Sequence, residues 1–376
     1  MNKTWLGAAA LMHFLAYPFA ALAEDGISDN EIMLGQTVGL TGLVADPVKE
    51  TNEGANLFFD AVNGNGGVNG RKVKLVTIDD KFDPELAKAN ARTLIERQHV
   101  FALFQGRGTP HTEAILPLLA QYRVPLIAPG SGATVLREPV NKWVFNIRAK
   151  YQDEVIDAVR VFAAMGIRNI GLISVDDDFG RDGMEGFKRA MKMFDLTPNA
   201  IVTYGRVGSD YAATAAEATR SNPQALIVIS SSRNTVELVK ALHTSGNRAQ
   251  IMTLSNNSSE SFAREIHEIG QDIIVSQIVP APNSSTPLGR EFETAARKAG
   301  VPVSYAALEG YVNAKVLVEG LRRAGHNPTR EGLVHALESM DAFDVGGMVI
   351  SYGHNDHSGS KYVDLTILDK RGRFIH

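Results

Sequence analysis

Short apolar segments alternate with amphipathic, helix-forming segments along most of this chain. A strand that is apolar throughout must be covered on both faces, and strands that are joined by helices pair in parallel. The alternation therefore predicts an α/β fold in which helices cover both faces of parallel sheets. In the first series the predicted strands are Ile32–Val38, Val73–Ile78, Val100–Phe104 and Pro125–Ala128, and the predicted helices are 53–62, 84–97 and 110–122.

A second series of the same kind begins after residue 150. Two such series predict two doubly wound, Rossmann-like lobes. The chain after residue 280 offers too few elements for a third domain, so we expect it to be shared between the lobes and to cross between them more than once. The second series has predicted strands at 170–175, 200–204, 225–230, 250–255 and 273–279, and predicted helices at 152–165, 181–193, 210–220, 235–244 and 260–269; helices at 289–299, 308–324 and 330–340 and a strand near 348–351 follow.

The first residues have a different character. Lys3 is the only charged residue before Glu24, and the segment from Trp5 to Ala23 is apolar and ends in Ala-Leu-Ala. This pattern predicts a secretory signal peptide at 1–23, too short and wrongly flanked for a membrane span. The sequence contains no cysteine, which leaves nothing for disulfide formation or lipid attachment. We therefore expect a soluble protein of the bacterial periplasm that is not a lipoprotein.

A glycine-rich stretch, Val62–Val76, raises the possibility of a dinucleotide-binding fingerprint. That fingerprint runs from strand to glycine turn to helix. Here the order is reversed, and Asn69 occupies the position of the third glycine. The stretch therefore predicts a helix-to-strand turn whose glycines adopt positive φ. With a formal net charge of −4 and no basic face, no nucleic-acid partner is expected either.

Candidate binding residues lie in the loops that follow strands, because ligands of open parallel sheets bind beyond the carboxyl ends of the strands. Thr109 suits a helix N-cap and Pro110 suits the next position. The start of that helix offers free N–H groups and a positive dipole end to a carboxylate. The next loop, Ala128–Thr134, combines glycines with Ser131, and Pro129 excludes a G-x-S-x-G nucleophile elbow.

The second series has two comparable loops, Val175–Gly180 and Ser230–Asn234. The first carries three aspartates without EF-hand spacing, and the second offers hydroxyls, an amide and a cation. His354 and His357 have no third ligand nearby in the sequence. We therefore expect no metal and no cofactor.

The order of motifs along the chain resembles a known family. The segments "IMLGQTVGLTG", "GANLFFDAVNGNGGVNGRKVKLVTIDDKFDPELAKANARTLIE", "VPLIAPGSG", "VDDDFGRDG" and "LEGYVNAKVLVEGLRRAG" resemble the leucine/isoleucine/valine-binding type of periplasmic solute-binding protein. The resemblance implies a type I periplasmic binding fold, with two lobes joined by three crossover segments and a ligand between them. It implies no catalysis, and it implies delivery of the ligand to an ABC permease whose transmembrane and ATPase subunits are separate chains.

From the resemblance we expect residues 24–148 and 281–346 in lobe 1 and residues 149–280 and 347–376 in lobe 2. The expected crossings are near 147–151, 278–282 and 344–349. By position, Thr109 corresponds to the residue that holds the ligand carboxylate. The expected ligand-binding residues are Gly108, Thr109, Gly130, Ser131, Gly132, Tyr151, Asp178, Phe179, Ser231 and Asn234.

Two ligand classes stay open. Gly130 stands where a backbone carbonyl receives a ligand ammonium, but Asn234 stands where amino-acid binders often carry an acid. Asp178 is a candidate to replace that acid, which would suit a branched-chain or other amino acid. Otherwise the ligand is an amine-free aromatic or organic acid, and Arg107 and Arg233 would favour it by adding positive charge.

Two other functions are weighed. The same fold could serve as the sensing module of a chemoreceptor or sensor kinase. Tyr311 and Lys315 match the Y-x-x-x-K dyad of short-chain dehydrogenases, but Asp46 stands where their glycine turn needs a glycine. We expect Tyr311 to pack within an amphipathic helix, and we expect the protein not to be an enzyme.

Overall fold

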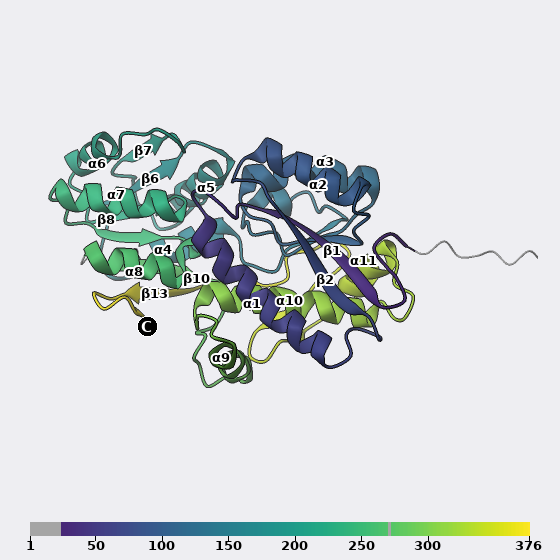
Figure 1. The fold of residues 1–376 in the computed structure, drawn as a ribbon. Helices are drawn as coiled ribbons and strands as arrows, with labels where there is room; N and C mark the ends of the chain where they lie inside the picture. Colours follow the sequence, from purple (N-terminus) through teal and green to yellow (C-terminus); the bar gives the residue numbers. More distant parts are fainter. Residues whose placement is uncertain (1–23, 270–271) are drawn as a thin grey trace, which may run out of the picture.

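The apolar segments of the sequence form the central strands of two separate sheets. The computed structural model describes residues 24–269 and 272–376, so the expected signal peptide at 1–23 lies outside the described residues. The two sheets belong to two α/β lobes that lie side by side (Figure 1). Within the described residues, no helix is both long and apolar enough to cross a membrane.

The first lobe contains a five-stranded parallel sheet of order β2-β1-β3-β4-β5. Its core is built from apolar side chains of the sheet and of the helices packed on it. The strands are β1 (Glu31–Val38), β2 (Lys72–Asp79), β3 (Ala102–Phe104), β4 (Leu126–Ile127) and β5 (Val144–Phe145), and the helices are α1 (Ala45–Gly64), α2 (Pro84–Glu96), α3 (Thr109–Tyr122), α9 (Pro287–Ala299), α10 (Tyr305–Arg323) and α11 (Arg330–Glu338).

The second lobe contains a seven-stranded sheet of order β14-β13-β10-β9-β8-β6-β7. The strands from β10 to β7 are parallel, whereas β13 and β14 add an antiparallel edge that the sequence did not predict. The strands are β6 (Ile170–Val175), β7 (Ile201–Tyr204), β8 (Ala225–Ile229), β9 (Gln250–Thr253), β10 (Ile273–Gln277), β13 (Asp364–Leu368) and β14 (Phe374–Ile375), and the helices are α4 (Tyr151–Ala164), α5 (Asp178–Met193), α6 (Tyr211–Arg220), α7 (Ser232–Thr244) and α8 (Glu260–Ile269).

The glycine-rich stretch forms a helix-to-strand turn, as the sequence predicts. Helix α1 ends at Gly64 and strand β2 begins at Lys72. Gly67 and Gly70 have φ angles of 77° and 85°, in the region that favours glycine. A Cβ on Gly67 would also lie 2.0 Å from the carbonyl oxygen of Arg71. The turn is thus a structural feature of the first lobe.

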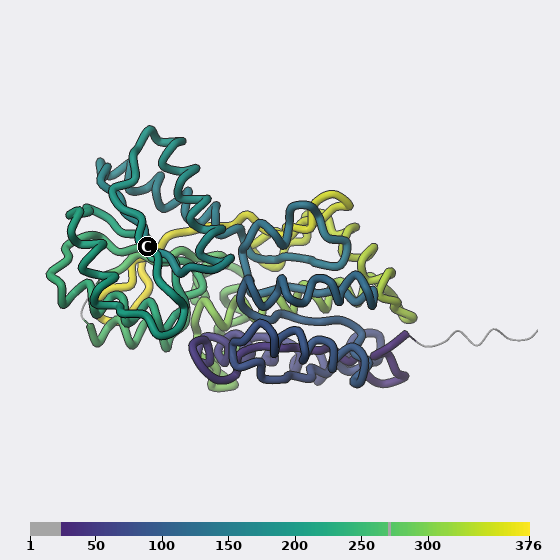
Figure 2. Tube along the Cα trace, turned by 90° about the horizontal axis from the view of Figure 1, so that it is seen from above, coloured from purple at the N-terminus to yellow at the C-terminus, as the bar shows by residue number. Residues whose placement is uncertain are grey.

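The chain passes between the lobes at three places, and Figure 2 shows the lobes from above. The first two passages connect β5 to α4 and β10 to α9. The third lies later than the predicted 344–349, because Met348 and Tyr352 are buried in the first lobe's core. The hairpin of β11 (Phe343–Asp344) and β12 (Val349–Ile350) keeps this segment there, and the chain reaches the second lobe at β13.

Helices α1 and α10 pack backbone to backbone in the first lobe, because each presents a glycine to the other. A Cβ on Gly54 would lie 1.8 Å from the carbonyl oxygen of Ala307, and a Cβ on Gly310 would lie 1.8 Å from that of Thr51. No side chain fits at either position without moving a helix.

We expect Gly54→Ala to lower the free energy of unfolding by roughly 1–3 kcal/mol, because the added methyl group forces the two helices apart. Urea denaturation followed by circular dichroism measures this change. Gly64→Ala is the matched control, since it lies in the same helix and nothing is within 4 Å of the added Cβ. Equal unfolding midpoints for the two variants would show that the close helix contact is not important for stability.

Candidate functional site

A pocket lies between the lobes at the carboxyl ends of their strands. Each strand from β1 to β9 contributes at least one lining residue from the segment that follows it. The empty space inside the pocket is about 320 Å³, open solvent included. The lining residues of this interlobe pocket are Val44, Phe82, Arg107, Gly108, Thr109 and Gly130 from the first lobe and Tyr151, Phe179, Arg206, Ser231 and Asn256 from the second.

Thr109 lies in this pocket, but not as the N-cap that the sequence predicts. It is the first residue of α3, and Gly108 is the N-cap with a φ of 99°. The Thr109 hydroxyl is instead hydrogen-bonded to the Ser131 hydroxyl at 2.8 Å. The first N–H groups of a helix have no partner within it, and Pro110 removes one of them. The start of α3 therefore presents a buried hydroxyl, backbone donors and a positive dipole end to the pocket.

The loop after β4 shapes this site from behind. Ser131 is fully buried and positions the Thr109 hydroxyl without lining the pocket. Gly132 also lies outside the lining, because its carbonyl accepts the N–H of Tyr151 and a Cβ would lie 2.8 Å from that nitrogen. Gly130 lines the pocket, and its carbonyl accepts the N–H of Gly108 at 3.4 Å.

Aromatic rings face the pocket from both lobes. Tyr151 and Phe179 lie 4.7 Å apart between ring centroids in the second lobe. Phe82, from the first lobe, stacks on His111 at 4.2 Å and carries the guanidinium of Arg206 at 5.1 Å on its ring. This cation–π contact joins the lobes. Phe82 and Arg206 are not among the predicted site residues, since each is an isolated residue in a loop after a strand.

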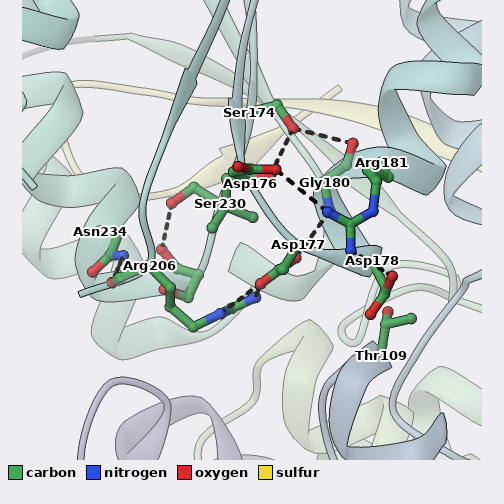
Figure 3. A network of polar contacts seen from close by, with 12 residues as sticks. Thr109, Ser174, Asp176, Asp177, Asp178, Gly180, Arg181, Arg206, Ser230 and Asn234 are labelled. Atoms are coloured by element: carbon green, nitrogen blue, oxygen red, sulfur yellow. Dashed lines mark hydrogen bonds and ion pairs between the residues drawn. The ribbon is translucent and has the colours of Figure 1, made fainter.

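The polar groups of the second lobe mostly satisfy one another (Figure 3). Asp177 caps α5 and pairs with Arg206, whose Nε lies 2.7 Å from the carboxylate. Asn234 donates from its amide to the backbone carbonyl of Arg206 at 2.9 Å. Asp178 pairs with Arg181 at 2.7 Å. Neither Asn234 nor Asp178, both expected to bind the ligand, lines the interlobe pocket.

Ser231 is the exception among these polar groups. It is the N-cap residue of α7, its side chain makes no capping hydrogen bond, and the residue is only 4% exposed. Its hydroxyl oxygen is buried and has no hydrogen-bond partner among the described residues. Ser231 therefore brings an unused hydroxyl to the pocket, from the lobe opposite Thr109.

Arg107 lines the pocket, although it is not among the predicted ligand-binding residues. Its Nη2 donates to the backbone carbonyl of Asn256 at 2.6 Å, which joins the two lobes. Arg107 also lines a recess in the first lobe together with Glu309 and several amide side chains. Burial lowers the pKa of Arg107, and the charge of Glu309 opposes this shift. Arg233, the other cation that the sequence offered, is exposed and does not line the pocket.

Arg148 lies behind the pocket, where the chain first passes between the lobes. It is 3% exposed, and its guanidinium lies 3.5 Å from Glu309 in the first lobe and 3.6 Å from Glu154 in the second. It also lies 5.0 Å from the Tyr151 ring centroid. Although burial opposes it, the neighbouring Tyr151, Glu309 and Glu154 raise the pKa of Arg148. This guanidinium is therefore charged in the folded protein.

A pair of acids faces across the gap between the lobes. Burial first, and then Asp178 on α5, raise the pKa of Glu113 on α3 to about 7. The positive charge of Arg181 opposes this shift, and Asp182 adds to it. One Glu113 carboxylate oxygen is buried and has no hydrogen-bond partner among the described residues. Closely apposed lobes thus favour the protonated form of Glu113.

Two other sequence patterns lie away from the pocket. Tyr311 and Lys315 both contact Glu291, at 2.7 Å each, and neither lines the pocket. His354 and His357 both lie near Glu338, at 3.3 and 3.4 Å. Across 24–269 and 272–376, no group of three or more His, Cys, Asp or Glu side chains is arranged to hold a metal ion.

Comparisons with known proteins agree with this architecture. Residues 31–373 match the family described as periplasmic binding protein. The chain is 20% identical, over 370 residues and 97% of each chain, to a protein of Brucella melitensis named Leu/Ile/Val-binding protein homolog 3.

Solved structures show the same fold. A substrate-binding periplasmic protein from Ralstonia solanacearum is 30% identical with a TM-score of 0.84, covering 92% of this chain and 99% of that chain. A branched-chain amino acid ABC transporter protein from Thermus thermophilus, solved with bound valine, is 16% identical with a TM-score of 0.82, covering 93% and 96%. This chain therefore belongs to the periplasmic binding protein family and has the type I fold that the resemblance implied.

Proposed function

We propose that this protein is the extracytoplasmic solute-binding component of an ABC importer. In this role it binds a small carboxylate-bearing solute between its lobes, closes around it, and presents it to separate transmembrane and ATPase subunits. The observation that carries the proposal is the interlobe pocket, to which both lobes contribute the starts of helices, aromatic rings and hydroxyls. The family and the names of the relatives support it.

The proposal assigns no chemical step to the pocket. A general base or nucleophile needs a partner that activates it, and the hydroxyls of Thr109 and Ser231 have none of the usual ones beside them. Thr109 is bonded to another hydroxyl, and Ser231 has no partner among the described residues. The pocket is suited to binding, in which closure is driven by the preference of the solute for the closed state.

The proposal also includes export. The apolar segment at 1–23 directs the chain to the periplasm and is then removed, which leaves Glu24 as the first residue of a soluble protein that is not a lipoprotein. Glu24 lies 4.0 Å from the guanidinium of Arg330.

A solute screen by thermal unfolding tests the function directly. Branched-chain amino acids, aromatic amino acids and aromatic and aliphatic carboxylic acids are each added to the purified protein. A solute that binds only the folded state, present at a concentration of 100 times its Kd, adds about 2.7 kcal/mol to the free energy of unfolding. It therefore raises the melting temperature. Small-angle scattering should then show a more compact particle with the same solute. A screen with no shift for any carboxylate would contradict the proposed function.

We expect Thr109→Val to weaken solute binding about fivefold to tenfold, because it removes one hydrogen bond worth about 1–1.5 kcal/mol and keeps the side-chain shape. Isothermal titration calorimetry with the solute from the screen measures the change. Thr93→Val on α2 is the matched control, since its hydroxyl bonds only the Ala89 carbonyl, away from the pocket. Unchanged affinity in Thr109→Val would remove this residue from the binding site.

We expect solute affinity to fall as the pH rises through about 7. In the structure, burial and then Asp178 raise the pKa of Glu113 to about 7. When the lobes separate, water reaches this carboxyl and Asp178 moves away, so its pKa returns toward the ordinary 4.5. Between these values the closed state binds more protons than the open state, so closure is favoured at the acidic end and disfavoured at the alkaline end.

Calorimetric titrations at pH 5.5, 7 and 8.5 check this expectation. Glu113→Gln is the matched variant, because it keeps the neutral shape and removes the titration. Its affinity should change little over the same interval. A variant with the same pH dependence as the unmodified protein would mean that another group is responsible.

A further inference from the structure

The charged side chains that line the interlobe pocket are cations. Its lining contains two cations, Arg107 and Arg206, and no carboxylate side chain among the described residues. Arg206 is neutralised by Asp177. Arg107 has no carboxylate within 4.0 Å in the described part of the chain, and its nearest polar contact is the neutral carbonyl of Asn256. Arg107 is therefore the cation that is available to a bound solute.

The acids that could receive a ligand ammonium are already paired or lie elsewhere, and the acceptor in the lining that has no partner in the described part of the chain, Oδ1 of Asn256, is neutral. Asp178 is paired with Arg181 outside the pocket, and the Asn234 amide donates to a backbone carbonyl. The carbonyl of Gly130 accepts a hydrogen bond from Gly108. Burying an ammonium without an anionic partner is costly, so the pocket disfavours amino acids.

Glu309 is the carboxylate that lines the adjoining recess, but it does not provide the missing partner. It lines the recess next to the pocket, where Arg107 also lies, and its side chain is 3.5 Å from Arg148. An ammonium placed beside Glu309 would have to approach both of these guanidinium groups. Glu309 and Glu154 both flank Arg148, and Arg107 adds a second cation, so neither acid is left free to pair with an ammonium.

The same lining is suited to an anion. The helices α3 and α7 both direct their N-terminal ends at the pocket through Thr109 and Ser231, and helix N-termini favour negative charge. Ser231 is more than nine-tenths buried and its hydroxyl has no partner within 24–269 and 272–376, so it can donate to a carboxylate. A guanidinium such as that of Arg107 binds carboxylates through two parallel hydrogen bonds.

The other residues that line the pocket determine which kind of solute body fits beside the carboxylate. Phe82, Tyr151 and Phe179 provide aromatic faces, and Val44 adds an aliphatic side chain. These groups can cover an apolar or aromatic solute body, and they offer it no charged partner.

We propose that the solute is an organic carboxylate without an α-ammonium group, that its body is apolar or aromatic, and that Arg107 binds its carboxylate. This inference rests on the proposed solute-binding function and narrows it. Arg107 is then a specificity-determining residue. The relatives named for leucine, isoleucine and valine would differ from this chain in the class of solute.

Solutes that differ only in the amino group test the inference. Calorimetry compares phenylalanine with 3-phenylpropanoate and leucine with 4-methylpentanoate on the full chain. We expect the amine-free member of at least one pair to bind tenfold or more tightly than its amino-acid partner. Equal or tighter binding of the amino acids would overturn the inference and leave the proposed function intact. Binding of neither series would overturn both.

Variants at Arg107 test its role with the same probes. Arg107→Gln should weaken binding of the better carboxylate tenfold or more, and Arg107→Lys should lose less because it keeps the charge. Binding of the uncharged 3-phenylpropanamide should change little in Arg107→Gln, which separates loss of charge recognition from damage to the pocket. Arg233→Gln is the matched control, since Arg233 is exposed outside the pocket. Full carboxylate affinity in Arg107→Gln would overturn the assignment.

Discussion

The buried guanidinium of Arg148 is the point on which the arrangement of the two lobes depends. It contacts Glu309 of the first lobe and Glu154 and Ser255 of the second, and Glu154 also accepts hydrogen bonds from the Ser255 N–H and the Ser276 hydroxyl. A buried charge that loses its partner is strongly destabilising, so these groups must stay together. The chain passage beside them, and with it Tyr151 at the edge of the pocket, is thereby held in place.

A second contact, between helices α1 and α8, also joins the two lobes. The carboxylate of Glu50 on α1 accepts hydrogen bonds from the N–H groups of Glu260 and Ser261 at the start of α8, at 2.8 and 2.9 Å, and from the Ser304 hydroxyl. One lobe thus caps a helix of the other, satisfying donors that have no partner within that helix. This contact and those of Arg148 both join the two lobes through residues that do not line the pocket.

The pocket combines rigid support with unused donors. Asp177, Asn234 and Ser131 hold other side chains and do not line the interlobe pocket themselves. Hydroxyls and a guanidinium that have few partners of their own are then presented by helix starts in a mostly apolar space. In such surroundings a charge-assisted hydrogen bond is stronger than in water. The chemistry of the pocket therefore follows from which polar groups the supporting network has left unpaired.

The sequence by itself determined the elements, because they depend on local patterns. Apolar strands, amphipathic helices and the glycine turn before β2 follow from side-chain periodicity and backbone freedom, and the loops after strands correctly marked the segments that line the pocket. Several local predictions differ from the structure. Helix α1 begins at Ala45 instead of residue 53, α5 begins at Asp178 instead of Arg181, and the third passage between the lobes lies beyond Tyr352.

Only the tertiary structure decided which residue of each loop faces the interlobe pocket. Phe179 lines the pocket and the adjacent Asp178 does not, because Asp177 caps α5 and the helix turns successive side chains in different directions. In the same way Arg107 and Ser231 face the pocket while Ser131 and Asn234 support it. Such choices depend on how two lobes, distant in sequence, pack against each other, and no local pattern contains that information.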